Sequence, residues 1–188
     1  GLTIVLLPAC QLVKVKEKNI HQAIRSKSEN ILTHDQLSAE TTSLLKLLSL
    51  TPQQCTAEFE TCLQRLNTQT DIAADERYAA LSELYLAQAL ELSKQRNCTH
   101  AQPHSENNHC LEQSLNAFDQ SLRYSYVYLF KMQESPSTRV FDQRQMHVRT
   151  FYNVALSRLI TTAYRTQPFH QVPAQLNVQQ RQYIVNLE

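Results

Sequence analysis

The sequence predicts an all-α protein, either an irregular helical bundle or a short stack of antiparallel helical hairpins, with an extended C-terminal tail. The chain of 188 residues contains a single glycine, Gly1, and no tryptophan, whereas average usage would supply about 13 glycines. It is rich in leucine, alanine and glutamine, which are good helix formers. Three long stretches repeat apolar residues at helical spacing. A chain of this length usually builds one core, so we expect one helical domain.

The same composition limits the chemistry that the chain can support. Phosphate-binding loops, dinucleotide fingerprints and the G-x-S-x-G nucleophile elbow all need glycine where the backbone turns at positive φ or approaches a ligand closely. We therefore expect no cofactor, and no serine, histidine or aspartate stands in a pattern that identifies a catalytic residue. The formal net charge of +1 provides no bulk attraction to nucleic acid, so no nucleic-acid partner is expected.

The N-terminus carries the sharpest local signal. Residues 2–7 are almost continuously apolar, and Leu7-Pro8-Ala9-Cys10 then places a small residue directly before a cysteine. This pattern resembles the lipobox at the end of a bacterial signal peptide, in which the cysteine thiol receives the lipid. It predicts lipidation of Cys10, with residues 1–16 as signal-peptide remnant, lipobox and tether. A short buried strand or helix start that happens to end in cysteine is the alternative.

A lipid on Cys10 would place the protein in the bacterial cell envelope. By resemblance to such lipoproteins, Gln11 after the cysteine implies the outer membrane, with the protein facing the periplasm. Lys14, Lys16 and Lys18 would then lie close to the headgroups, where each adds about 1 kcal/mol of attraction to an anionic surface. A solvated linker explains these lysines equally well, because an acidic residue interrupts the run.

Short helices are predicted between residues 17 and 66. Apolar residues recur only weakly at helical spacing over residues 17–32, which are interpreted as a short helix or an ordered strap. Ser38 can cap a helix that runs to Leu50. Thr51-Pro52-Gln53-Gln54 is a stronger start, because threonine can cap, proline suits the first helical position and glutamine completes a capping box. The helix over 51–66 that follows has one apolar stripe, made of Cys55, Phe59, Cys62, Leu63 and Leu66.

Three long amphipathic helices are predicted next, over 75–96, 110–132 and 139–164. The polar stretches between them are short enough to join antiparallel neighbours. The third helix has a wide apolar stripe, made of Val148, Phe151, Tyr152, Ala155, Leu156 and Leu159. We therefore expect this helix to contact two neighbours and to lie centrally, and the helical domain to span 17–165.

The pattern changes after Tyr164. Pro168 and Pro173 punctuate a glutamine-rich stretch, and residues 182–187 alternate in part and are rich in β-formers. They predict a strand, whose partner would be either an early segment of the chain or a strand further downstream. Residues 166–188 are therefore interpreted as an extended linker that contains the first strand of a downstream domain.

Four cysteines remain once Cys10 is set aside for lipid, and beyond the inner membrane they can form disulfides. Cys98 and Cys110 bracket the polar connection between the first two long helices, so we expect them to pair and to close a loop worth about 3 kcal/mol. Cys55 and Cys62 would be separated by about 10.5 Å of helical rise, beyond the limit of about 7 Å for a disulfide. They are expected to be buried thiols, or a second disulfide if the helix over 51–66 breaks.

Histidines in the same polar connection raise the question of zinc. His100, His104 and His109 lie between Cys98 and Cys110, and imidazoles and thiols both bind zinc. Their spacing fits no compact ligand pattern, and a polar loop closed by a disulfide explains them without metal. We therefore assign no metal site. The three histidines stay candidates for a zinc-dependent enzyme, which is a third function hypothesis beside the two that follow.

Several short motifs along the chain together resemble one family. They are the lipobox at Cys10, Arg25, Ile31-Leu32-Thr33, Leu37-Ser38, Thr41 or Thr42, Leu81-Ser82-Glu83-Leu84-Tyr85-Leu86-Ala87 and Phe151-Tyr152-Asn153. In this order they resemble the N-terminal helical region of bacterial lipoproteins that continue into an α/β-hydrolase domain. The resemblance implies an accessory domain of a serine esterase or lipase. In that family the nucleophile lies downstream, so no catalytic residue is carried onto this sequence.

A second resemblance is to tetratricopeptide-like helical hairpins. Leu84-Tyr85-Leu86-Ala87, followed by Ala117-Phe118 and Leu122, is similar to the alternation of small and large residues in those repeats, although no period of about 34 residues recurs. This resemblance implies the alternative function, a stand-alone periplasmic lipoprotein that binds a protein or peptide in a groove. The expected partners are the membrane, through the lipid, and either a downstream domain or a separate protein.

Overall fold

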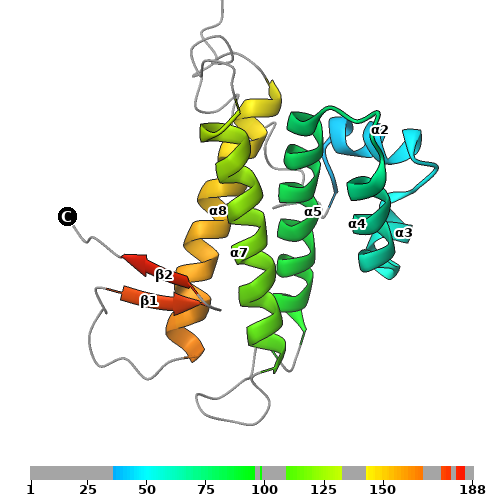
Figure 1. Ribbon diagram of the computed structural model, residues 1–188. Coiled ribbons are helices and arrows are strands. Elements are labelled where there is room, and N and C mark those ends of the chain that lie inside the picture. The colour runs from blue at the N-terminus through cyan, green and yellow to red at the C-terminus, as the bar shows by residue number, and fades with distance from the viewer. Residues whose placement is uncertain are drawn as a thin grey trace, which may run out of the picture.

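The computed structural model of the protein describes residues 36–95, Cys98, 109–132, 143–166, 175–178 and 181–184. Its elements are α2 (Ala39–Leu47), α3 (Pro52–Ala57), α4 (Phe59–Thr68), α5 (Ala74–Lys94), α7 (His109–Phe130), α8 (Gln143–Thr166), β1 (Gln175–Val178) and β2 (Arg181–Ile184). The described part is therefore helical apart from one two-stranded hairpin, which confirms the predicted all-α fold (Figure 1). The helix or strap predicted over 17–32 and the lipobox at Cys10 lie outside the described residues.

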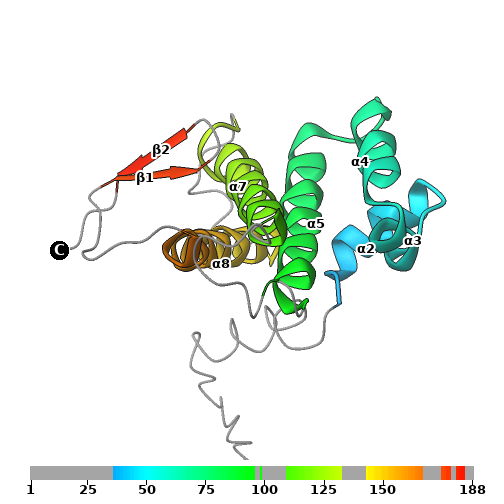
Figure 2. The same cartoon turned by 90° about the horizontal axis from the view of Figure 1, so that it is seen from below.

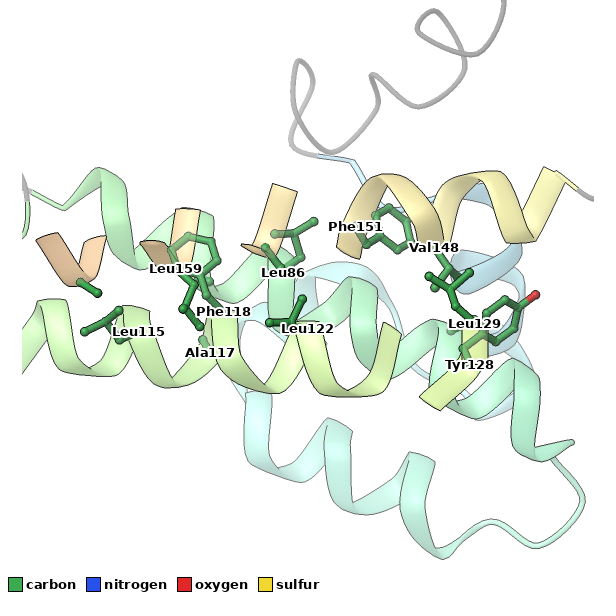
Figure 3. Close-up of a cluster of buried hydrophobic side chains, with 14 residues drawn as sticks. Leu86, Leu115, Ala117, Phe118, Leu122, Tyr128, Leu129, Val148, Phe151 and Leu159 are labelled. Atoms are coloured by element: carbon green, nitrogen blue, oxygen red, sulfur yellow. The ribbon is translucent and has the colours of Figure 1, made fainter. Parts of the chain in front are cut away.

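Three long helices form the body of the fold, as predicted. We call α5, α7 and α8 the three-helix unit; they run side by side, each antiparallel to the one before it (Figure 1). All three contribute to the main apolar core, which includes Leu86, Ala89, Leu115, Phe118, Leu122, Leu129, Val148, Phe151, Ala155 and Leu159. Figure 3 shows the large side chains of this core, such as Leu86, Phe118 and Leu159, meeting between the helices. Burial of such side chains is the main favourable contribution to folding.

Small residues line the contact between α5 and α7. The hydroxyl of Ser114 donates to the carbonyl of Ala89 over 3.1 Å, and the hydroxyl of Ser121 donates to the carbonyl of Ser82 over 2.7 Å. Both serines are fully buried, so these bonds satisfy polar groups that would otherwise destabilise the core. Serine and alanine thus give the close approach of helix backbones in a chain whose only glycine is its first residue.

The central helix is α7, not α8. α7 packs along both α5 and α8, whereas the contact between α5 and α8 is much smaller. The expectation that the helix over 139–164 lies centrally is therefore wrong, although α8 does contact two neighbours. The physical reason lies in the buried serines of α7, such as Ser114 and Ser121. They widen the packed surface of α7 beyond its apolar stripe.

A smaller layer covers the outer face of α5. We call residues 36–68, which contain α2, α3 and α4, the N-terminal layer; it lies on the opposite side of the three-helix unit from the hairpin (Figures 1 and 2). Its apolar cluster joins residues of the layer to α5: Leu44, Leu45, Leu50, Leu63 and Leu66 meet Ala80, Leu81 and Leu84. The predicted helix starts are confirmed, because the Ser38 side chain caps α2 and Thr51 and Gln54 form a capping box on α3.

The turn between α2 and α3 uses a serine where helices usually place glycine. Ser49 has φ of 56°, in the left-handed region. The amide of Leu50 donates to the carbonyl of Leu45, and the amide of Ser49 donates to the carbonyl of Lys46. This pair of bonds is the Schellman arrangement at a helix C-terminus. A residue with a Cβ costs about 1 kcal/mol in this conformation.

The helix predicted over 51–66 is broken at Glu58. α3 ends at Ala57 and α4 begins at Phe59, with Glu58 between them at φ −124° and ψ 60°. The break brings the Cα atoms of Cys55 and Cys62 to 5.1 Å, and the two cysteines form a disulfide. The prediction of one continuous helix is therefore wrong. Of the two alternatives for these cysteines, the structure has the second disulfide.

The C-terminal strand finds its partner locally. β1 and β2 pair antiparallel, with Leu176 opposite Tyr183. The predicted strand within 182–187 thus exists as β2, and among the described residues its partner is β1, the segment just before it, which was not among the expected partners. Local pairing closes a short loop and so loses little chain entropy. The hydroxyl of Tyr183 bonds to the carboxylate of Asp119, which attaches the hairpin to α7.

Candidate functional site

A buried carboxylate lies where the N-terminal layer meets the three-helix unit. Glu83 of α5 has no exposed surface. It accepts hydrogen bonds from the backbone amide of Ser38 over 2.5 Å, from the hydroxyl of Ser38 over 2.6 Å and from the hydroxyl of Thr41 over 2.5 Å. Three donors on one carboxylate satisfy its ionised form. The start of α2 is therefore fastened to the middle of α5.

Arg144 of α8 completes this group. One terminal nitrogen of its guanidinium donates to the hydroxyls of Ser38, over 3.1 Å, and Thr41, over 2.9 Å, and lies 3.6 Å from the Glu83 carboxylate. Its Nε lies 3.4 Å from the carboxylate of Glu76. We call Ser38, Thr41, Glu76, Glu83 and Arg144 the polar junction. It joins α2, α5 and α8, which are far apart in the sequence.

The polar junction is suited to holding helices together. Glu83 and Arg144 are both almost fully buried, and each is bonded to the other and to hydroxyls. The oxygens of the Glu83 carboxylate are thus occupied by donors fixed at the start of α2 and on α8. Next to the junction, His147 of α8 lies 3.7 Å from the Glu40 carboxylate and stacks on Phe151. These contacts extend the attachment of α2 to α8.

Aromatic rings form a second contact between the two regions. Tyr85 of α5 stacks on Tyr124 of α7 at 5.6 Å and meets Phe59 of α4 edge-on at 5.3 Å. Desolvation raises the pKa of Tyr85 from 10.0 to about 12, with smaller contributions from the charges of Tyr124 and Glu60. The phenol therefore stays protonated at neutral pH. The role of Tyr124 is therefore packing between α5 and α7.

A groove opens on the other side of the molecule, between α7, α8 and β2. It has a volume of about 270 Å³ and is lined by Leu122, Arg123, Tyr126, Val127, Tyr152 and Tyr183. Tyr126 is 44% exposed, and Phe130 beyond it on α7 is 57% exposed. Phe130 packs against both Tyr126 and Tyr152, and Lys131 lies over the Tyr126 ring at 5.8 Å. Large exposed aromatic side chains gathered in one place are typical of interaction surfaces.

The elements around this groove have a distinctive charge. Residues 120–132 contain Arg123 and Lys131 and residues 143–166 contain four arginines, whereas neither stretch nor either strand contains an aspartate or a glutamate. Residues 36–94, by contrast, carry eight acidic and four basic side chains. Arg123, Lys131 and Arg149 are exposed, and Arg149 lies one helical turn before Tyr152. We call Arg123, Tyr126, Phe130, Lys131, Arg149 and Tyr152 the basic aromatic face.

A smaller cavity of about 170 Å³ lies between the N-terminal layer and α5. Leu37, Phe59 and Leu84 form its apolar part, and Cys55 of the disulfide also lines it. Gln88 and Glu91 provide polar groups at α5. The cavity has the size of one apolar side chain. We regard the larger groove, with its exposed rings and cations, as the candidate functional site.

The structure places the predicted site residues as follows. Cys98 and Cys110 form a disulfide with a Cα separation of 5.4 Å, which is the favoured pairing, and both are buried. His109 is exposed at the first residue of α7, while His100, His104 and Cys10 lie outside the described residues. Within the described ranges no group of three or more histidine, cysteine or acidic side chains could hold a metal ion. No helix in the described part is long and apolar enough to span a membrane.

Sequence reasoning missed both the polar junction and the basic aromatic face. Glu83 stands in an otherwise apolar run, where a charge on the buried side of a helix is a signal for a partner. Nothing in the local sequence identifies Arg144 as that partner. The absence of acidic residues from 120–132 and 143–166 was visible in the sequence, but only the fold brings these stretches together.

The comparisons identify no family: no family model, no curated protein and no solved structure matches the chain. The resemblances to lipoproteins with an α/β-hydrolase domain and to tetratricopeptide-like hairpins therefore stay predictions.

Proposed function

We propose that this chain is the helical accessory domain of a bacterial envelope lipoprotein. In this proposal a lipid on Cys10 holds the domain at the outer membrane, facing the periplasm, and an α/β-hydrolase domain of the same protein performs the chemistry. The helical domain positions that hydrolase at the membrane surface. The motifs described above that resemble such lipoproteins support the proposal, and so do the two disulfides of the fold.

The single observation that supports it most is the pair of disulfides. Cys55–Cys62 and Cys98–Cys110 fasten two separate parts of the fold. Disulfides of this kind persist in oxidising compartments such as the bacterial periplasm and are rare in the cytosol. An extracytoplasmic location is also what a lipid on Cys10 requires. Two independent features, one at the N-terminus and one in the core, thus agree.

A second function is favoured by a different observation. The groove between α7, α8 and β2, with Tyr126 and Phe130 exposed beside it, suits a stand-alone periplasmic lipoprotein that binds a protein or peptide. In this alternative the helices have the role of a tetratricopeptide-like binding module, and no hydrolase domain is needed.

The complete reading frame and its activity separate the two functions. For the accessory domain we expect a G-x-S-x-G motif between a strand and a helix downstream of residue 188. The whole protein should then hydrolyse a short-chain nitrophenyl ester, and residues 1–188 alone should not. A reading frame without a serine-hydrolase domain would refute the first function and leave the binding module. In high salt, which weakens electrostatic attraction to the bilayer, Cys10→Ser should move the protein from the membrane to the soluble fraction; unchanged fractionation in high salt would refute the lipid anchor.

A further inference from the structure

We propose that the basic aromatic face is a docking surface for an anionic lipid bilayer. This inference rests on the proposed function in one respect, because the lipid anchor is what brings the face near a membrane. The surface itself is defined by Arg123, Tyr126 and Phe130 of α7, by Lys131 directly after α7, and by Arg149 and Tyr152 of α8. Its test uses protein without lipid.

Charge complementarity is the first argument for an anionic occupant. Arg123, Lys131 and Arg149 are exposed, and the described helical segments that carry them contain no acidic residue between 120 and 132 or between 143 and 166. Asp119, the acidic residue of α7 nearest to the face in sequence, is 1% exposed and bonded to Tyr183. Each cation near an anionic bilayer strengthens binding about fivefold. The excess of acidic side chains lies in residues 36–94.

The aromatic side chains provide the second argument. Phe130 and Tyr126 are 57% and 44% exposed, in contact with each other, and Phe130 also meets Tyr152 of α8. Aromatic rings with a polar end or a neighbouring cation prefer the boundary between headgroups and acyl chains. There the ring lies against the acyl chains, while the polar group stays among the hydrated headgroups. The contact of Lys131 with the Tyr126 ring places an ammonium directly beside that boundary.

The walls of the groove favour lipid over an acidic peptide. Arg123 and the tyrosines provide its polar atoms, and the other lining residues are Leu122 and Val127. Two of its three walls are helices, whose backbone groups bond within the helix. An extended acidic peptide laid along the two helical walls would therefore find few partners there for its own backbone groups, and unpaired groups weaken binding. The acyl and glycerol region of a bilayer has no backbone amides that need hydrogen-bond partners.

Vesicle binding tests the proposal directly. The probe is residues 1–188 carrying Cys10→Ser, so that no lipid is attached, mixed with vesicles that contain phosphatidylglycerol or with vesicles of phosphatidylcholine alone. We expect sedimentation with the first and not with the second, and release as salt is raised. Arg123→Glu with Arg149→Glu should weaken binding by about thirtyfold or more, because two cations are lost. Tyr126→Ser with Phe130→Ser should weaken it without changing its dependence on salt.

The matched control reverses two cations elsewhere. Lys46→Glu with Lys94→Glu changes the net charge by the same amount, but these residues lie on α2 and α5. This control should bind as the parent protein does, and circular dichroism should show that every variant keeps its helices. All variants share the same N-terminal segment, so differences between them report on the face alone.

Three results would overturn the proposal. One is absence of binding to phosphatidylglycerol vesicles by the folded parent protein, and another is equal weakening by the face variant and the control. The third is a protein that binds no vesicles but forms a salt-sensitive dimer, which dissociates when Arg123→Glu and Arg149→Glu are introduced. This result would assign the face to a second copy of the chain. None of these results depends on whether Cys10 is lipidated in the cell or whether a hydrolase domain follows.

Discussion

The N-terminal layer and the three-helix unit are held together in different ways. The three-helix unit is joined mainly by apolar packing, with serine hydroxyls bonded across the α5–α7 contact. The N-terminal layer has a smaller apolar cluster, which includes the Cys55–Cys62 disulfide, and it is fastened by the polar junction around Glu83. Short helices bury little apolar area each, so their position depends on a few directional bonds. The long helices share a larger continuous apolar core, so directional bonds such as those of Ser114 and Ser121 add to packing that already fixes their position.

Removal of the Glu83 carboxylate should have the largest effect. Glu83→Ala removes the buried carboxylate that accepts from the hydroxyls of Ser38 and Thr41 and pairs with Arg144. Removing one partner of a buried ion pair lowers the free energy of unfolding by about 3–5 kcal/mol. Urea unfolding followed by circular dichroism measures this loss, and protection from proteolysis should fall first in the N-terminal layer.

Two controls make this test specific. Glu91→Ala removes a carboxylate that is 59% exposed and should change stability by less than about 0.5 kcal/mol. Adding Arg144→Met to Glu83→Ala should restore part of the loss, because both members of the buried ion pair are then replaced by apolar side chains. A loss below about 1 kcal/mol for Glu83→Ala would mean that the layer is held by apolar contacts, as the three-helix unit is.

The disulfides allow the two regions to be compared directly. Cys98→Ser with Cys110→Ser should lower the free energy of unfolding by about 3 kcal/mol, and Cys55→Ser with Cys62→Ser by about 2.5 kcal/mol, because the second loop is shorter. Urea unfolding measures both, with wild-type protein in a reducing agent as the control for loss of both bonds. Mass mapping under non-reducing conditions should find these two pairs. A linkage from Cys55 to Cys110 would contradict the structure.

A smaller gain is expected at the turn between α2 and α3. Ser49 has a positive φ, and glycine removes the steric cost of its Cβ, so Ser49→Gly should raise the free energy of unfolding by about 1 kcal/mol. Ser49→Val should lower it, since a branched side chain is less tolerant of this conformation. Thermal unfolding of the three proteins gives the order. If glycine brings no gain, the turn is not strained in solution.

The smallest expected effect is at Tyr85, which contacts both regions. Its pKa is raised from 10.0 to about 12, first by desolvation and then by the charge of Tyr124. Below pH 10 the folded and unfolded states are both protonated there, and between pH 10 and 12 mainly the unfolded state loses its proton. Stability should therefore fall as pH rises through this window. Because the ring is partly exposed, the loss should stay below about 1 kcal/mol.

Tyr85→Phe provides the control for this pH dependence. The variant should lose the part of the alkaline destabilisation that arises from this phenol, while its stability at neutral pH changes little. Phenolate absorbance in the near ultraviolet follows the titration, and urea unfolding at several alkaline pH values follows the stability. The same alkaline slope in both proteins would mean that Tyr85 titrates as a solvated tyrosine.

Local sequence signals predicted the position of each described helix well. The capping box at Thr51 and Gln54 and the cap at Ser38 formed as expected, because these bonds involve residues only three positions apart. Apolar stripes located the three long helices for the same reason, since a stripe reports which face is buried. Glu58 was the exception. The helix break at Glu58 accompanies the Cys55–Cys62 disulfide and the packing of α3 on α4. No local sequence pattern indicates either of these contacts.

By itself, the sequence determined that the chain is helical, where the described helices begin, and which cysteines bracket the connection between α5 and α7. These properties depend on residues within one or two turns of each other. Only the tertiary structure decided that α7 is central, that Glu83 meets Arg144, that β2 pairs with β1, and that cations and aromatic rings from α7 and α8 share one face. Each of these depends on the free energy of contacts between distant segments, which packing of the whole chain selects.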